Sequence, residues 1–411
     1  MLLLVLLVRS NDTYYHAIFN RSPPLLVISI SGLRHDYIKL SEEFIGTHSL
    51  KNFQRLISQG SVIRRLFNVF PTETLPNHHS IVTGLYPESH GVIGNRIYIR
   101  ANHSFIDSKN QTSLNFDNWL NTDNPPIWVD AEANEIKTAT LLWPLADQEV
   151  KGEYPTQSVS QFAKLNGPNG MSIAKRFEMI ERWLIHPKYN IKLILAYFDQ
   201  LSLTAKEFAP ESIEVARKLE EFDEHIGDLL ESLEKAQIKP NIIILSDYGM
   251  SSLVKNHVID INDCVHLNSI KISNSAPTIF VYINQGFEEE IIYMKLRQCH
   301  KHMKAYKIPE MPHAEHFDKG ENERMPDMVL IADKGWIIKG EEGDIQNSAS
   351  GYSVLNQDMS PTLIAYGPDF RVGFSLDFVE TIDIYPLLCH LIRLNCNNSY
   401  GNPKKIFQIL S

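Results

Sequence analysis

Apolar runs separated by amphipathic stretches constrain the fold of this chain more than any other feature of its sequence. Residues 25–31, LLVISIS, form a continuous apolar run just before a glycine, which is typical of a strand buried on both faces of a parallel sheet. Similar apolar runs follow at residues 137–143, 191–198, 241–247, 277–283, 326–332 and 362–367. The stretches 49–60 and 211–236 carry apolar residues at helical spacing. The sequence therefore predicts an α/β fold, with a mostly parallel central sheet and helices on both of its faces.

In sheets of this kind, functional groups lie where strands end and loops begin. Residues 68–99 combine backbone constraints with oxygen chemistry, because Pro71 and Pro76 stiffen a turn around the hydroxyl of Thr74. A helix-like run from His78 to Thr83 follows. A hydroxyl near a helix N-terminus suits a site for an oxyanion, and it equally suits an ordinary N-cap threonine. The residue types alone leave both interpretations open.

The whole segment from residue 70 to residue 95 reads FPTETLPNHHSIVTGLYPESHGVIGN. It resembles, almost position for position, the signature of the ectonucleotide pyrophosphatase/phosphodiesterase family, which belongs to the alkaline-phosphatase-like superfamily. The resemblance extends from Leu25 to the C-terminus and is to the short members without accessory domains. It implies an alkaline-phosphatase-like core, with Thr74 at the nucleophile position and Asn95 at the position of a phosphoryl-oxygen donor. Leu75 stands where the nucleotide-cleaving members carry a phenylalanine that packs on the base.

The resembled family binds two zinc ions through three aspartates, three histidines and the nucleophilic threonine. Zinc at neutral pH prefers imidazole, thiolate or carboxylate ligands. The matching segments of this chain, ISISGLR, YFDQLSLTAKEFAP, SDYGM and SASGY, retain only Asp247 among the six Asp and His positions. The other five ligand positions hold Ser31, Ser202, Lys206, Tyr248 and Ser350. The resemblance therefore implies a pseudoenzyme without a zinc cofactor, in which Thr74 and Asn95 are vestigial.

Lys206 would place an ammonium group where the family binds a dication, and the two charges repel each other. Two hypotheses follow. The ammonium group pairs with phosphate or another anion as a point charge, or it forms an internal salt bridge that neutralises Asp247.

Two groups of titratable residues are expected to have no catalytic role. His78 and His79 lie inside the signature segment and are expected to be structural. The acids of EFDEH, residues 221–225, are expected to lie on a solvated face of a helix.

The four cysteines form no C-x-x-C pair, and their number alone permits three disulfide connectivities. The resemblance to the short family members implies the pairs Cys264–Cys299 and Cys389–Cys396. N-glycosylation sequons begin at Asn11, Asn20, Asn102, Asn110 and Asn397. Together these features favour a secreted or extracellular glycoprotein; a cytosolic protein would instead carry four buried thiols.

The composition of the chain limits the kinds of partner that it can bind. The formal net charge of −10 and the lack of a basic stripe argue against nucleic acid. No apolar run is long enough for a transmembrane segment. We interpret residues 1–22 as a leader or disordered N-terminus and residues 23–411 as a single phosphodiesterase-like domain. An unidentified protein or an anionic ligand is the expected partner.

Three functions are compatible with the sequence. The first is a catalytically inactive, secreted phosphodiesterase-like protein that acts by binding. The second is an active phosphodiesterase that hydrolyses nucleotide phosphodiesters with a rearranged or single metal site and Thr74 as nucleophile. The third is a structural or adhesive extracellular glycoprotein.

Overall fold

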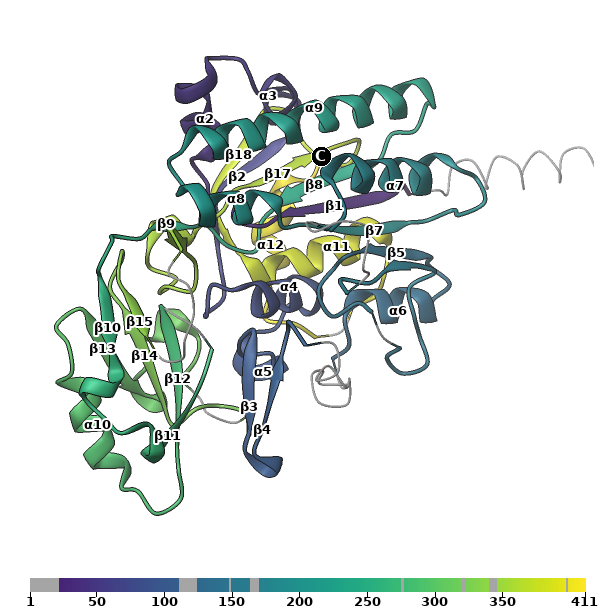
Figure 1. The fold of residues 1–411 in the computed structure, drawn as a ribbon. Helices are drawn as coiled ribbons and strands as arrows, with labels where there is room; N and C mark the ends of the chain where they lie inside the picture. Colours follow the sequence, from purple (N-terminus) through teal and green to yellow (C-terminus); the bar gives the residue numbers. More distant parts are fainter. Residues whose placement is uncertain are drawn as a thin grey trace, which may run out of the picture.

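A computed structural model describes residues 22–110, 124–147, 149–162, 170–274, 277–318, 322–339, 346–396 and 398–411 of the chain. Its centre is an eight-stranded sheet with the strand order β18-β2-β17-β8-β1-β7-β5-β6 (Figure 1). The strands of this sheet are β1 (Leu25–Ile30), β2 (Ser61–Phe67), β5 (Thr138–Leu141), β6 (Gln157–Val159), β7 (Leu193–Phe198), β8 (Asn241–Leu245), β17 (Leu363–Tyr366) and β18 (Phe374–Glu380).

The central sheet is mostly parallel, as the apolar runs predict. Strand β1 pairs in parallel with both β7 and β8, and the β5–β6, β5–β7 and β18–β2 pairs are also parallel. Only β17 runs antiparallel to its neighbours, β2 and β8. Every residue of β1 is buried: Leu25 and Val27 join the core on one face of the sheet, and Leu26 and Ile28 join the core on the other. Burial on both faces explains why this strand is a continuous apolar run.

Helices cover both faces of the sheet (Figure 1). One face carries α2 (Tyr37–Ile45), α3 (Lys51–Gln59), α7 (Ile173–Ile185), α8 (Gln200–Phe208) and α9 (Ile213–Lys235). The other carries α4 (Thr74–Thr83), α6 (Ile127–Ala133), α11 (Ile384–Ile392) and α12 (Pro403–Ile406), with the short α5 (Pro87–His90) beyond α4. No helix in the described ranges combines the length and the apolar character that crossing a membrane requires.

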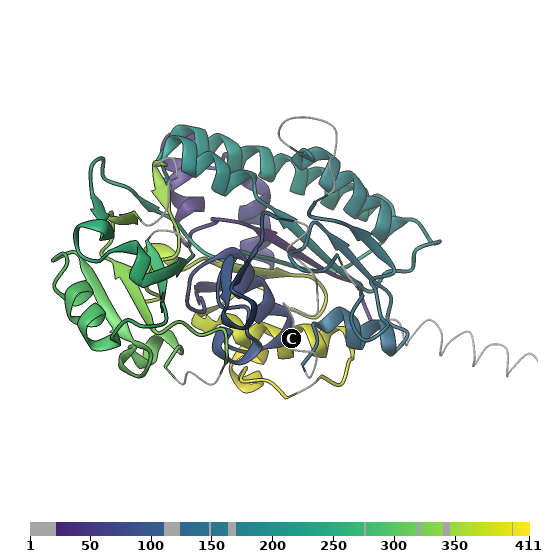
Figure 2. The same ribbon diagram turned by 60° about the horizontal axis from the view of Figure 1, so that its bottom comes forward.

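Two of the apolar runs belong to a second, smaller sheet. Residues 277–283 and 326–332 form β12 (Thr278–Ile283) and β14 (Met328–Ala332), which pair antiparallel with each other. The sheet has the order β11-β12-β14-β13, a core of its own and α10 (Glu289–Arg297) against β13. In both views it lies to one side of the central sheet (Figures 1 and 2). Its other strands are β11 (Ile270–Ser273) and β13 (Met303–Lys307). The remaining strands of the described residues form two-stranded pairs: β3 (Arg96–Ile99) with β4 (Ser104–Asp107), β9 (Ser251–Ser252) with β16 (Ser348–Ala349), and β10 (Val258–Asp260) with β15 (Ile337–Lys339).

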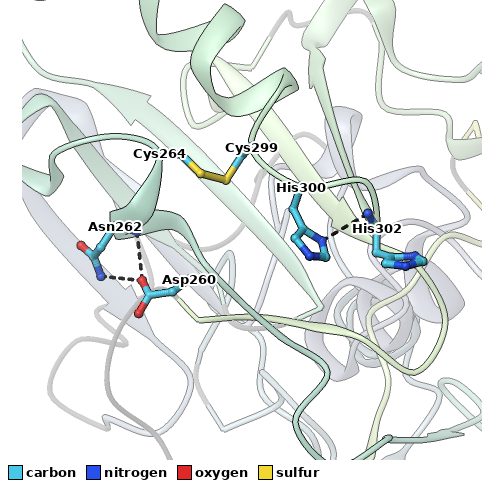
Figure 3. Close-up of a disulfide and its surroundings, with 6 residues drawn as sticks. All are labelled: Asp260, Asn262, Cys264, Cys299, His300 and His302. Atoms are coloured by element: carbon cyan, nitrogen blue, oxygen red, sulfur yellow. Dashed lines mark hydrogen bonds between the residues drawn. A yellow bond between two sulfur atoms is a disulfide. The ribbon is translucent and has the colours of Figure 1, made fainter.

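The structure contains both disulfides that the family resemblance implies. Cys264–Cys299 joins Cα atoms 5.5 Å apart, and Cys389–Cys396 joins Cα atoms 5.9 Å apart. Figure 3 shows the first bond beside the turn in which Asp260 accepts hydrogen bonds from the backbone and side-chain amides of Asn262. This disulfide therefore ties the segment that leads into the smaller sheet to the end of α10.

The segment EFDEH is not uniformly solvated, because Asp223 is only 1% exposed. Its Oδ1 accepts hydrogen bonds from the backbone N–H groups of Asn52 and Phe53, at 2.9 and 2.7 Å. These groups belong to the first turn of α3, and Leu50, at the N-cap position of α3, provides no side-chain cap. Asp223 on α9 therefore caps a different helix, and sequence spacing could not reveal this contact.

We expect Asp223→Ala to lower the free energy of unfolding by about 2–3 kcal/mol, since two backbone donors of α3 lose their acceptor. Asp223→Asn keeps an oxygen in the same place and should cost clearly less. Urea denaturation of the two variants measures the difference. An alanine variant within about 0.5 kcal/mol of the natural protein would contradict this role.

Candidate functional site

Thr74 is the first residue of α4, so this helix begins four residues earlier than the sequence pattern suggested. Glu73, with extended backbone angles, holds the N-cap position, and the interpretation of Thr74 as an N-cap is therefore wrong. Pro76 is tolerated because the first turn of a helix needs no internal N–H donor. The Asn77 side chain fixes the turn by donating to the carbonyl oxygens of Pro71 and Glu73, at 3.1 and 3.0 Å.

A buried polar network lies between α4 and the ends of β1 and β8. Ser31 Oγ donates to Asp247 Oδ2 at 3.2 Å, and His78 Nδ1 lies 3.6 Å from the same oxygen. His78 Nδ1 also lies 2.8 Å from the carbonyl oxygen of Thr74, and its Nε2 lies 2.9 Å from Ser29 Oγ. Because β1 and β8 are parallel neighbours, their carboxyl ends bring Ser31 and Asp247 together. His78 is fully buried, as expected of a structural residue, but its contact with Asp247 was not anticipated.

Burial dominates the electrostatics of this network. It raises the pKa of the Asp247 carboxyl, and the nearby His78 and Ser31 oppose this in smaller measure. It also lowers the pKa of His78. The salt bridge between Lys206 and Asp247 does not form: the carboxylate is enclosed by Ser31, His78 and the backbone N–H of Tyr248, whereas Lys206 is half-buried on α8. The hypothesis that Lys206 neutralises Asp247 is therefore wrong.

Two further residues that the resemblance places at ligand positions, Ser202 and Tyr248, adjoin this network. Ser202 lies beside the residue that follows Ser31: a Cβ on Gly32 would lie 3.0 Å from the Ser202 Cβ, and the φ of Gly32 is +82°. Only glycine meets both requirements without strain. Tyr248 is 3% exposed and donates its backbone N–H to Asp247 Oδ1 at 3.1 Å.

The segment after β16 also contacts the residues that precede α4. Ser350 is half-buried, and the next residue, Gly351, donates its N–H to Thr72 Oγ1 at 3.0 Å. A Cβ on Gly351 would lie 3.4 Å from Glu73 Oε1. The structure thus gathers residues from four distant segments, those of Ser31, Ser202, Asp247 and Ser350, around the segment that contains Thr74.

Glu73 is a site residue that the sequence analysis missed. It is 5% exposed, its Oε2 accepts the Asn95 N–H at 3.2 Å, and its Oε1 accepts from Asn274 Nδ2 at 2.6 Å. Burial raises the pKa of Glu73 to about 7, while the bonds to Asn95 and Asn274 and the charge of Lys206 act in the opposite direction. The sequence did carry one signal for Glu73: it is an acidic residue directly before the first residue of a helix, where the helix dipole favours negative charge.

Hydrogen-bond donors remain available at the surface of the site. Thr74, Asn95 and Lys206 are half-buried, and within the described part of the chain Thr74 Oγ1, Asn95 Nδ2 and Lys206 Nζ have no hydrogen-bond or ion-pair partner. Asn95 Oδ1 accepts the Leu75 N–H at 3.0 Å, which fixes the amide group. Leu75 is only 2% exposed, so its side chain offers no face to a base.

The donor set does not fit a pair of zinc ions. It offers two carboxylates, Asp247 and Glu73, whose oxygens already accept hydrogen bonds from neighbouring donors. The remaining groups are neutral hydroxyls and an ammonium group, whereas zinc prefers imidazole, thiolate or carboxylate. Both ring nitrogens of His78 are already engaged by Thr74 and Ser29. Across the residues that the structure describes, no three His, Cys, Asp or Glu side chains are grouped so that they could hold a metal ion.

Two of the five sequon asparagines, Asn102 and Asn110, are described and exposed. The other three, Asn11, Asn20 and Asn397, lie outside the described residues.

Comparisons with known proteins agree with this architecture. The family model described as type I phosphodiesterase / nucleotide pyrophosphatase matches residues 25–353. Bis(5'-adenosyl)-triphosphatase ENPP4 of Bos taurus is 30% identical over 392 residues, which cover 93% of this chain and 82% of that protein. Human ectonucleotide pyrophosphatase/phosphodiesterase family member 5 is 27% identical over 386 residues, which cover 92% of this chain and 76% of that protein.

Among solved structures, murine ENPP5, as an inactive variant in complex with AMP, is similar with a TM-score of 0.85 and 25% identity. The similarity covers 95% of this chain and 100% of that chain, and it confirms the expected alkaline-phosphatase-like α/β core. With four fifths of its length matched by the family model, the chain belongs to the type I phosphodiesterase / nucleotide pyrophosphatase family.

Proposed function

We propose that this chain is a secreted phosphodiesterase-like protein that has lost five of the six Asp and His zinc ligands, does not hydrolyse phosphodiesters, and acts by binding. The donor set around Thr74 carries the proposal. It keeps the hydroxyl of Thr74, the amide of Asn95 and the ammonium group of Lys206 free for an anion. It lacks the ligands that would bind zinc, which in this family stabilises the negative charge of the transition state.

A second candidate is an active phosphodiesterase with a rearranged metal site. The half-buried Thr74 hydroxyl at a helix N-terminus favours it, and so does the similarity to a protein named as a bis(5'-adenosyl)-triphosphatase. Against it, a neutral hydroxyl is a weak nucleophile that needs an adjacent base or a metal. Both ring nitrogens of His78, which contacts the carbonyl oxygen of Thr74, are engaged by that carbonyl and by Ser29.

Metal analysis and a turnover assay on the purified protein separate the two candidates. We expect no zinc to remain after dialysis, and no hydrolysis of nucleotide phosphodiesters above the level of a Thr74→Ala control. The loss of metal-ion stabilisation removes several kcal/mol of barrier lowering, and each ~1.4 kcal/mol is a factor of ten in rate. Tightly bound zinc together with turnover that Thr74→Ala abolishes would establish the second candidate instead.

The proposal that the protein is secreted rests on the two disulfides and on the N-glycosylation sequons. Expressed in a secretory host, the chain should gain mass that a glycosidase removes, and Asn102→Gln with Asn110→Gln should reduce that gain because both asparagines are exposed. Cys389 and Cys396 should resist alkylation until a reductant is added. Unmodified asparagines together with freely alkylated cysteines would indicate a cytosolic protein.

A further inference from the structure

A cavity of about 260 Å³ lies between the smaller sheet and the loop that follows Gly351. One of its walls is β13, the edge strand of the smaller sheet, and residues from the end of β14 line it as well. The segment 352–356 forms the opposite wall. None of the residues gathered around Thr74 lines this cavity, so the two sites are separate.

Two hydrogen-bond donors of β13 lack partners at this cavity. Lys304 and Tyr306 both line it, and their i, i+2 spacing places them on the same face of the strand. Within the described part of the chain, neither Lys304 Nζ nor the Tyr306 hydroxyl has a hydrogen-bond or ion-pair partner. An ammonium group and a phenol hydroxyl on one face are suitable donors for the two oxygens of a carboxylate.

The opposite wall is held in place by a buried acid. Glu315 is 2% exposed, and its two oxygens accept hydrogen bonds from Ser353 Oγ and from the backbone N–H of Val354. Ser353 Oγ in turn accepts the N–H of Leu355 at 3.2 Å. These bonds fix the backbone at Leu355, whose side chain lines the cavity and is 63% exposed. A ligand with an apolar body would remove this side chain from water.

The remaining charged groups of the cavity are paired. Asp333 Oδ2 lies 3.1 Å from His302 Nδ1, and Lys334 Nζ lies 2.5 Å from Asp358 Oδ2. Lys304 is then left as a charged group of the wall without a partner among the described residues. Charge complementarity therefore favours an anion as the ligand.

We propose that this cavity binds a small carboxylate with an apolar body, whose oxygens accept hydrogen bonds from Lys304 and Tyr306 and whose body packs on Leu355. Ile331, the strand partner of Lys304, adds a second apolar contact. The volume suits a ligand smaller than a drug, since sites for drug-sized ligands have about 300–1,000 Å³. The inference goes beyond the proposed function, because it concerns a different site.

A carboxylate and its neutral amide isolate the role of charge. Phenylacetate and phenylacetamide have nearly the same shape. Isothermal titration of the full chain should give an affinity for phenylacetate that is higher by roughly tenfold or more. Lys304→Met keeps the apolar stem and removes the charge, so it should lower the affinity for phenylacetate to that for the amide. Tyr306→Phe should lower it by roughly fivefold, because one hydrogen bond is lost.

Lys301→Met is the matched control, because Lys301 is an exposed lysine in the turn before β13 and does not line the cavity. It makes the same change in net charge and should leave both affinities within about twofold, since salt screens exposed charges. Both lysines are exposed, so both variants should fold.

Three results would overturn the inference. The first is binding of phenylacetate no tighter than that of the amide, and the second is binding of neither probe. The third is an equal loss of affinity in Lys304→Met and Lys301→Met, which would leave Lys304 with the common role of an edge-strand lysine that discourages pairing with another chain.

These outcomes are distinct from a failure of the proposed function. Lys206→Met removes the ammonium group of the Thr74 site and should not change the affinity for phenylacetate. If Lys206→Met abolished that binding and Lys304→Met did not, phenylacetate would occupy the Thr74 site. The inference would then be wrong while the proposed binding function would stand. Turnover of a nucleotide phosphodiester that Thr74→Ala abolishes would refute the proposed function and leave the affinities at the cavity unchanged.

Discussion

A variant that restores all five missing ligands is expected to bind zinc and to gain phosphodiesterase turnover. The substitutions are Ser31→Asp, Ser202→Asp, Lys206→His, Tyr248→His and Ser350→His. Together with Asp247 and Thr74 they would rebuild the ligand set that the family resemblance implies. Two zinc ions would then supply several kcal/mol of transition-state stabilisation, so we expect a gain of at least about a thousandfold in turnover.

The structure explains why the restored side chains should meet. Ser31 Oγ already donates to Asp247 Oδ2, and Tyr248 follows Asp247 directly. Ser202 packs against Gly32, and Ser350 precedes the glycine that is bonded to Thr72. Each single substitution should have little effect, because a site with too few charged ligands binds metal weakly.

Thr74→Ala in the restored variant is the control. It should keep most of the zinc and lose the turnover, since it removes the nucleophile and only one ligand. A restored variant that folds normally but binds no zinc would show that these positions do not correspond to the family's ligands. Zinc stoichiometry and circular dichroism, measured on the same preparation, distinguish that result from misfolding.

We expect Glu73 to make the protein less stable as the pH rises from about 4.5 to about 7. Burial raises the pKa of Glu73 from its ordinary value of 4.5 to about 7 in the folded protein. The folded state therefore holds a proton that the unfolded state has lost, and the free energy of unfolding falls with rising pH across this window. The shift corresponds to about 3 kcal/mol for this nearly fully buried group.

Glu73→Gln isolates the effect. The unfolding free energy of this variant minus that of the natural protein should rise by about 3 kcal/mol between the two ends of the window, as denaturation at each pH would show. Other buried carboxyls, Asp247 and Glu315 among them, have raised pKa values of the same sign, and the subtraction cancels their contribution. A difference that stays constant with pH would mean that Glu73 ionises equally in the folded and unfolded states.

The sequence alone predicts five strands of the central sheet, namely β1, β5, β7, β8 and β17, whereas β2, β6 and β18 were not predicted. Strands such as β1 are buried on both faces, and this burial leaves a continuous apolar run that can be read without knowing any partner. The amphipathic helix α9 could also be predicted, because the residues on the face that contacts the core recur with the helical period. The segment from residue 70 to residue 95 pointed to Thr74 as the residue at the nucleophile position, because the order of its residues is specific to one family.

The roles of Asp223, His78 and Glu73 could not be predicted from the sequence, because each depends on a contact between distant segments. Asp223 caps α3 across a gap of more than 160 residues, and nothing in EFDEH distinguishes it from its solvated neighbours. The contact of His78 with Asp247 and the bonds of Glu73 to Asn95 and Asn274 likewise join distant segments. The smaller sheet was hidden for a related reason, since strands of separate sheets have the same local pattern. Local patterns report how each side chain is buried, whereas hydrogen bonds and charges depend on which partner the fold brings within reach.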